Sequence, residues 1–257
     1  MFPSSARCVP ALTLLLAACA ANGPTPEREH INEHMQAKIA RNVILFVGDG
    51  MGVSTVTAAR ILEGQLRGET GEENLLSFER FPYTALSKTY NINQQVADSA
   101  GTMSAMMTGA KTRAGVINIT ADNHRADCTG SLRRGLMSLP ELARAAGLAT
   151  GVVTTTRITH ATPAATFARS PAREWEVDSA MTDAARAAGC TDIARQLLEP
   201  ADGHGHDVVF GGGRAAFLPT TQTDPEYPGQ TGARRDGRDL IHEWLANNGT
   251  YVWDAEQ

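Results

Sequence analysis

The chain has 257 residues, of which 42% are hydrophobic and 20% are charged, and its formal net charge is −5. A chain of this length and composition can bury one large core, so it is a globular protein and neither a disordered nor a fibrous one. Its mild acidity gives no electrostatic reason to expect nucleic acid as a partner.

Residues 1–18 are predicted to be an export signal. One positive charge, Arg7, precedes the apolar run Ala11–Ala18, which is too short to span a bilayer. The tetrad Leu-Ala-Ala-Cys that ends at Cys19 resembles a bacterial lipobox, which implies cleavage before Cys19 and acylation of its thiol. The alternative is an ordinary signal peptide that is cleaved near Ala21.

Either signal places the mature protein outside the cytoplasm, in the bacterial periplasm or on a membrane as a lipoprotein. Residues 19–38 contain two prolines and mixed charge, which indicates a tether or an N-terminal arm.

The first strand is predicted over Asn42–Val47, because a continuous apolar run closed by glycine is typical of a strand buried on both faces of a parallel sheet. Asp49 then lies at the carboxyl end of that strand, where ligands and catalytic groups collect in open α/β sheets. The alternative role for Asp49 is to cap a helix over Ser54–Leu66.

The rest of the chain alternates between predicted strands and helices, which favours an α/β fold with a mostly parallel sheet. The further strands are expected over Tyr83–Asn91, Leu148–Thr155, Asp207–Phe210 and Thr250–Trp253. The further helices are expected over Ser99–Gly109, Leu139–Ala146, Asp178–Ala188, Asp192–Leu198 and Leu240–Asn247.

Ser99 is the candidate nucleophile. The run Ala97-Asp98-Ser99-Ala100-Gly101 approximates the nucleophile elbow G-x-S-x-G, so a serine esterase is one interpretation. Its histidine would have to be His204, His206 or His242. That mechanism has no role for Asp49, whereas a metal mechanism uses both residues: the aspartate holds the metal, and the metal holds the serine oxygen as an alkoxide.

A third group of polar side chains follows the strand predicted over Leu148–Thr155. The run Thr154–Ala164 offers several hydroxyls and the imidazole of His160, and oxygen-rich coordination suits magnesium. Arg173 can supply the bidentate fork that holds a phosphate. The alternatives are that the threonines only form a strand and that the arginine only coats the surface.

Four cysteines are present, and export would place them in an oxidising compartment. Setting aside Cys8 and the lipidated Cys19 leaves Cys128 and Cys190 as one pair. A bridge between them would close a loop of about 62 residues and stabilise the fold by about 4 kcal/mol on the chain-entropy model. Two unpaired buried thiols are the alternative.

These motifs resemble those of the alkaline phosphatase family, in the same order and with the same spacing, from about residue 41 to the end of the chain. The matching runs are Val47–Gly52, Asp98–Ala100, Thr154–Pro163, Arg173–Trp175 and Gly211–Arg214, together with the cysteine pair. The resemblance implies a three-layer α/β/α sandwich, with residues 39–257 as the N-terminal part of the catalytic domain. It also implies an alkaline phosphatase activity on small phosphate monoesters, and a homodimer.

The resemblance implies a role for each site residue. Asp49 would bridge a zinc and the magnesium, Ser99 would attack phosphorus to form a phosphoserine, and Thr162 would ligate magnesium. His160 would act beside the magnesium through water, and Arg173 would hold two phosphoryl oxygens. The complete family site holds two zinc ions and one magnesium ion.

The family's other metal ligands lie beyond the position that matches Gln257, so the chain is interpreted as a truncated N-terminal half. Asp202–His206 mimics the zinc motif Asp-x-x-x-His but precedes Gly211–Arg214, whereas the family motif follows it, and a surface loop is expected there. Half of a doubly wound sheet would leave apolar strand edges exposed, so we expect this chain alone to be poorly soluble and nearly inactive.

Two other functions stay open. One is a non-catalytic remnant that binds only phosphate or metal, which the missing ligands favour. The other is a sulfatase or phosphodiesterase. The match of Arg173 to the alkaline phosphatase motif and the absence of a Cys-x-Pro-x-Arg run argue against it.

Overall fold

The computed structural model describes residues 40–257. The export signal over residues 1–18, the arm over residues 19–38 and the acylation of Cys19 lie outside the described residues. The chain divides into two units, Met1–Gly48, of which residues 40–48 are described, and Asp49–Gln257.

In the first unit, the described residues 40–48 are extended but form no strand. The expected buried strand over Asn42–Val47 is therefore wrong for the described residues. Its apolar side chains point into solvent, with Phe46 89% exposed. A strand of a parallel sheet exists only when a neighbour accepts and donates its backbone hydrogen bonds, and no such neighbour pairs with residues 42–47 in the part of the chain that the structure describes.

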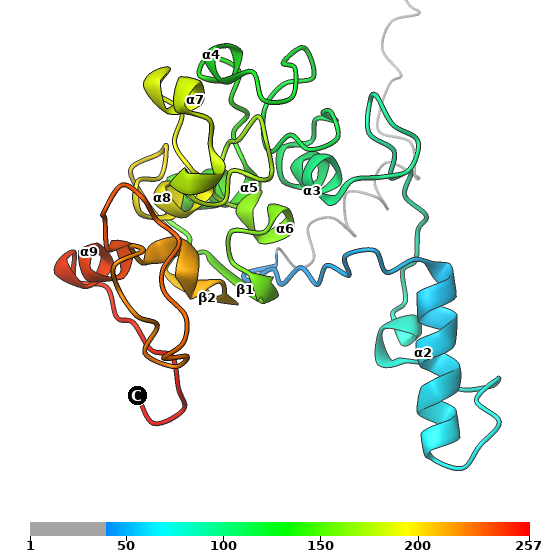
Figure 1. Ribbon diagram of the computed structural model, residues 1–257. Coiled ribbons are helices and arrows are strands. Elements are labelled where there is room, and N and C mark those ends of the chain that lie inside the picture. Colours follow the sequence, from blue (N-terminus) through cyan, green and yellow to red (C-terminus); the bar gives the residue numbers. More distant parts are fainter. Residues whose placement is uncertain (1–39) are drawn as a thin grey trace, which may run out of the picture. The chain divides into compact units, whose positions relative to one another are not determined.

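The second unit contains the helices and the sheet (Figure 1). The α-helices are α2 (Val53–Leu66), α3 (Ser99–Thr108), α4 (Cys128–Ser131), α5 (Leu139–Ala145), α6 (Ala161–Ala164), α7 (Asp183–Ala187), α8 (Ile193–Leu198) and α9 (Leu240–Ala246). Single 3₁₀ turns lie at Ser77–Arg80, Asp178–Ala180 and Arg214–Phe217. Within residues 40–257, no helix is both long and apolar enough to cross a membrane.

Two predicted strands are confirmed as neighbours in a parallel sheet. They are β1 (Gly151–Arg157) and β2 (Val208–Gly212) (Figure 1). In their register, Gly151 pairs with Val208. The glycines at the end of β2 permit this close approach. A Cβ at Gly211 would lie 2.7 Å from Thr154 Cγ2, which is closer than side chains pack.

One face of this sheet covers the hydrophobic core. Val152 and Val209 pack against a cluster that includes residues of α3, α6, α8 and α9. The opposite face is open in the described residues, with Val153 75% and Phe210 53% exposed. Parallel sheets are normally covered on both faces, so this face is an apolar surface left open in residues 40–257.

Two predicted strands are absent from the described structure, and side chains bind some of the carbonyls in these segments. In the segment Tyr83–Asn91, the ammonium of Lys111 donates hydrogen bonds to the carbonyls of Lys88 and Tyr90. In the segment Thr250–Trp253, the indole of Trp244 donates to the carbonyl of Thr250. Neither segment builds a ladder with a neighbouring strand.

The predicted helices are confirmed with small shifts at their ends, except that Asp178–Ala188 is broken. It contains the 3₁₀ turn Asp178–Ala180 and then α7, whose N-cap Thr182 accepts a hydrogen bond from the Ala185 amide. Asp178 is buried, and its carboxylate accepts a bond from the amide of Arg235, so this turn is held by a distant loop.

Candidate active site

Asp49 and Thr162 meet although 113 residues separate them in the chain. Thr162 Oγ1 donates a hydrogen bond of 2.9 Å to Asp49 Oδ2. Asp49 precedes a turn at Gly50, whose φ of +67° lies in the region that favours glycine. The N-cap of α2 is Gly52, with no side-chain cap, so the alternative role of Asp49 as that helix's cap is wrong.

Ser99 is the first residue of α3, where the unpaired backbone amides favour negative charge. The preceding residue, Asp98, caps the helix by accepting from the amide of Ala100 at 3.1 Å, and it also accepts from the amide of Gly115 at 2.7 Å. Burial alone would raise the pKa of Asp98, but these bonds and the guanidinium of Arg173 outweigh it and hold the pKa below its usual value.

Arg173 joins the nucleophile to the segment that carries Thr162. Its Nη1 donates to Ser99 Oγ at 2.9 Å and to Asp98 Oδ1 at 2.6 Å, while its Nη2 contacts His160 Nε2 at 3.0 Å. The backbone is fixed by a hydrogen bond from the Arg173 amide to the Gly115 carbonyl. A half-buried guanidinium beside a serine hydroxyl at a helix N-terminus is suited to hold an anion.

His160 is neutral in this arrangement. Since Arg173 Nη2 can only donate, His160 Nε2 accepts, and the buried Nδ1 has no hydrogen-bond partner in the described structure. Burial and then the charge of Arg173 lower the pKa of His160, against a smaller opposing effect of the Asp49 carboxylate.

The residues present fit part of a magnesium site. A carboxylate and a hydroxyl at hydrogen-bond distance are two hard oxygen donors, as magnesium prefers. Within residues 40–257, no group of three or more His, Cys, Asp or Glu side chains could hold a metal ion. Asp49 and Thr162 therefore supply two ligands of a site and not a complete one.

The esterase interpretation lacks its histidine. Within residues 40–257, Ser99 Oγ makes one hydrogen bond, which it accepts from Arg173. No histidine ring is hydrogen-bonded to Ser99 Oγ in these residues. His206, one of the three histidines considered, lies instead between Thr150 Oγ1 and Thr166 Oγ1, at 3.0 Å from each.

The side chains of Asp202 and His206 are held by other groups in the described residues. Asp202 pairs with Arg144 at 2.8 Å, and His204 is exposed. The expectation of a surface loop is wrong at His206, which is buried against the edge of the Phe167 ring. Burial lowers the pKa of His206 to about 4.

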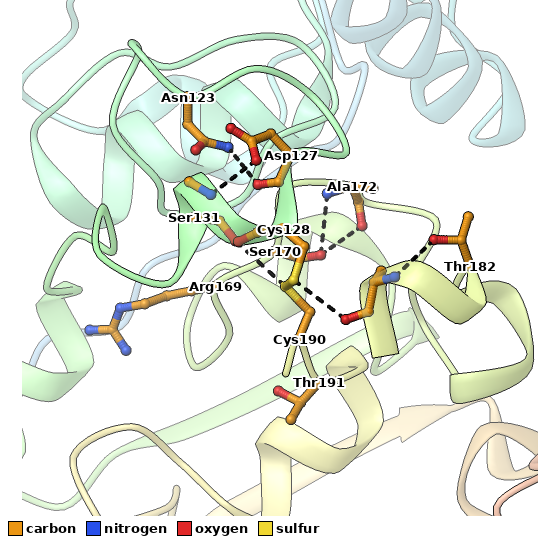
Figure 2. The surroundings of a disulfide bond; sticks show 12 residues. Asn123, Asp127, Cys128, Ser131, Arg169, Ser170, Ala172, Thr182, Cys190 and Thr191 are labelled. Carbon is orange, nitrogen blue, oxygen red and sulfur yellow. Dashed lines mark hydrogen bonds between the residues drawn. A yellow bond between two sulfur atoms is a disulfide. The ribbon is translucent and has the colours of Figure 1, made fainter. Parts of the chain in front are cut away.

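The predicted disulfide between Cys128 and Cys190 is present, so the alternative of two unpaired thiols is wrong (Figure 2). It joins the start of α4 to the segment between α7 and α8, with the two Cα atoms 5.9 Å apart. It packs in a buried cluster with Ala172 and Trp175, the residues close to Arg173 on both sides. The bridge therefore supports the loop that carries the guanidinium.

Two residues of the site have no role assigned by the sequence analysis. Asp98 holds Arg173, and its place before the first residue of a helix is a signal that could have identified a cap. Glu176 binds Arg157 and Thr159 beside His160, and no local pattern in the sequence marks a contact of that kind.

Comparison with known proteins gives one consistent result. A family model described as alkaline phosphatase matches residues 40–257. An alkaline phosphatase of Gadus morhua is 50% identical over 224 residues, which are 84% of this chain and 46% of that protein. The tissue-nonspecific isozyme of Gallus gallus is 43% identical over 271 residues, which are 96% of this chain and 52% of that protein.

The solved structures agree with the sequences. A cold-active alkaline phosphatase from the psychrophile Shewanella sp. superposes with a TM-score of 0.55 at 25% identity, over 82% of this chain and 41% of that one. This chain spans about half the length of the curated relatives it matches.

Proposed function

Because the chain belongs to the alkaline phosphatase family, we propose that it carries the nucleophile and phosphate-binding part of a phosphate monoester hydrolase. The observation that carries the proposal is the hydrogen bond of 2.9 Å from Arg173 Nη1 to Ser99 Oγ. It puts a planar cation beside a serine hydroxyl at the N-terminus of α3, where a phosphoryl group is bound most favourably.

Ser99 loses its hydroxyl proton, and Oγ attacks phosphorus. A bond from Oγ to phosphorus forms, the bond from phosphorus to the leaving oxygen breaks, and that oxygen takes up a proton and departs as the alcohol. Water then cleaves the phosphoserine, which releases inorganic phosphate and restores the hydroxyl of Ser99. In both steps Arg173 binds two phosphoryl oxygens with its fork, and the amides at the start of α3 favour the negative charge. Positioning and charge neutralisation dominate in phosphoryl transfer, and these residues supply both.

Asp49 and Thr162 would hold magnesium, and Asp49 would share a zinc. His160 would act beside the magnesium through water, and before phosphate binds its neutral ring is oriented by Arg173. When bound, the two zinc ions and the magnesium ion supply Lewis acids for the attacking and leaving oxygens. The adjacent oxygens of Asp49 and Thr162 support the magnesium assignment.

The partners and the location follow from the same proposal. Small phosphate monoesters are the proposed substrates, since the half-buried guanidinium of Arg173 can bind their phosphoryl oxygens. The sequence around Cys19 supports export as a lipoprotein into the periplasm, with a lipid anchor if its thiol is acylated. A homodimer rests on the family resemblance.

The test is acid-quenched mass spectrometry of the chain after incubation with zinc, magnesium and an aryl phosphate. We expect a phosphoryl group on the peptide that contains Ser99, its loss in Ser99→Ala, and slow turnover of this chain. Aryl sulfates and phosphodiesters, assayed in parallel, are expected to give no product. Phosphate binding without any label on Ser99 would instead favour the non-catalytic remnant, and hydrolysis that survives Ser99→Ala would overturn the proposal.

A further inference from the structure

The carboxylate of Glu176 has no role in the proposed mechanism. It joins the segment that carries Arg173 to the segment that carries His160 and Thr162. Glu176 accepts hydrogen bonds from Arg157 Nε at 2.8 Å, from Arg157 Nη2 at 2.7 Å and from Thr159 Oγ1 at 2.6 Å. Arg157 and Thr159 both lie in one tight turn, Arg157–His160, which is closed by a hydrogen bond from the His160 amide to the Arg157 carbonyl. Glu176 itself lies three residues after Arg173.

The carboxylate end of this contact is buried, whereas its cation is exposed. Thr159 is 0% exposed and the Glu176 side chain is 20% exposed, while the Arg157 side chain is 55% exposed. Burial alone would raise the pKa of Glu176, but the hydrogen bonds of Arg157 and Thr159 outweigh it and hold the pKa below its usual value. The carboxylate therefore stays ionised at neutral pH and keeps all three hydrogen bonds.

The backbone of Glu176 is fixed from the opposite side. Its carbonyl accepts from the amide of Ala194 at 3.1 Å, and the carbonyl of Trp175 accepts from the amide of Ile193 at 2.8 Å. Both amides belong to the first turn of α8, and the side chains of Ile193 and Ala194 lie in the core. Glu176 therefore connects a core helix to the turn that contains His160 and precedes Thr162.

We propose that Glu176 is a positioning residue that sets the separation between Arg173 and the segment carrying His160 and Thr162. This inference rests on the proposed function, in which Arg173 holds phosphate and Thr162 holds magnesium.

The reason is that phosphate binding removes the other side-chain contact between the segment of Arg173 and the segment of His160 and Thr162. In the described residues, the side chains of these segments are joined at Glu176 and by the contact of 3.0 Å between Arg173 Nη2 and His160 Nε2. When both Nη atoms of Arg173 turn to phosphoryl oxygens, the contact with His160 is released. The three hydrogen bonds of Glu176 then remain to hold the segments together.

The test compares Glu176→Ala and Glu176→Gln with the control Glu174→Ala. Glu174 lies in the same loop and is exposed, and its side chain pairs with the exposed Arg125. The first readout is the ¹⁵N spectrum of the His160 ring in the metal-free chain, assigned with His160→Gln. The second is the affinity for inorganic phosphate in the presence of zinc and magnesium.

We expect Glu176→Ala to shift the His160 ring resonances and to weaken phosphate binding by roughly 10-fold or more, because misplacement of a binding group is costly. Glu176→Gln keeps an acceptor for Thr159 but loses the charge that pairs with Arg157, so a smaller change in the same direction is expected. If the alanine variant does not fold, the glutamine variant replaces it in the test. Glu174→Ala should change phosphate affinity by less than about twofold, as is usual for an exposed ion pair.

Unchanged His160 resonances in both Glu176 variants would overturn the inference, as would equal phosphate affinities in the Glu176 and Glu174 variants. If the unmutated chain binds no phosphate, the proposed function fails, and the His160 spectrum alone still decides whether Glu176 positions this segment.

Discussion

Arg173 and Ser99, 74 residues apart in the chain, meet through a hydrogen bond of 2.9 Å from Nη1 to Oγ. The same Nη1 donates to Asp98 Oδ1 at 2.6 Å, so the residue before the nucleophile aims the guanidinium at it. Asp98 thus has two functions, since it also caps α3 and fixes where Ser99 stands. The position of the cation and the position of the nucleophile depend on one carboxylate.

The first prediction concerns the shape of that cation. Arg173→Lys keeps the charge but loses the planar fork that binds two oxygens, so it is expected to weaken phosphate binding on the order of 10-fold. The measurement is the inhibition constant of inorganic phosphate, together with KM for an aryl phosphate. Lys111→Arg, a change of cation away from Ser99, is the control and should leave both constants unchanged. Equal phosphate affinities for the unmutated chain and the Arg173→Lys variant would contradict a bidentate role.

Local patterns in the sequence predicted most of the helices and both strands of the sheet. Ser99 follows an aspartate that is a good N-cap, and the paired strands β1 and β2 follow from apolar runs that end at polar or glycine residues. The segment Asn42–Val47 shows the limit of such patterns. Its apolar run predicts a strand, but strand formation depends on a partner, and in residues 40–257 none pairs with it.

The site residues were predicted from the sequence, but some of their contacts were not. Residue type and position at the end of a strand, at the start of a helix or in a family motif identified Asp49, Ser99, Thr162 and Arg173. The contacts of Asp98 with Arg173 and of Glu176 with Thr159 join segments far apart in the chain or in separate turns. Such contacts depend on tertiary packing, which no spacing in a single sequence encodes.

The second prediction concerns the ligand pair. Thr162→Val keeps the volume of the side chain but removes the hydroxyl that donates to Asp49 Oδ2. Magnesium affinity is expected to fall on the order of 10-fold, because one of its hard oxygen ligands is lost. Isothermal titration with magnesium measures the change. Thr156→Val, on β1, is the matched control, and an unchanged magnesium affinity in Thr162→Val would remove Thr162 from the site.

The third prediction concerns the disulfide. The double variant Cys128→Ser, Cys190→Ser is expected to lower the free energy of unfolding by about 4 kcal/mol, because the bridge limits the unfolded chain. Urea denaturation with and without reductant measures the effect, and the reductant should destabilise only the unmutated chain. Since the bridge packs beside Ala172 and Trp175, phosphate affinity should fall together with stability. A reductant that leaves the midpoint of unfolding unchanged would refute the stabilising role.

The fourth prediction is a pH dependence of stability that arises from His206. Thr166 Oγ1 donates its proton to the carbonyl of Pro163 at 2.7 Å, so it must accept from His206 Nε2. Thr150 Oγ1 accepts from Arg144 Nη1 at 3.1 Å and is left to donate to His206 Nδ1. These partners are satisfied by a neutral ring, and burial together with the charge of Arg144 lowers the pKa of His206 to about 4.

In the unfolded chain this histidine takes up a proton near its ordinary pKa of about 6.5, whereas the folded chain does so only near pH 4. The contribution of neutral His206 is therefore complete above pH 6.5 and is lost as the pH falls from 6.5 to 4, by about 3 kcal/mol in total. His206→Gln keeps a donor for Thr166 and an acceptor for Thr150 but cannot take up the proton, so it should flatten this part of the stability curve. His204→Gln, in the same loop but exposed, should retain the full slope. Urea denaturation at several pH values distinguishes these outcomes, and equal slopes for His206→Gln and the unmutated chain would show that the acid sensitivity arises elsewhere.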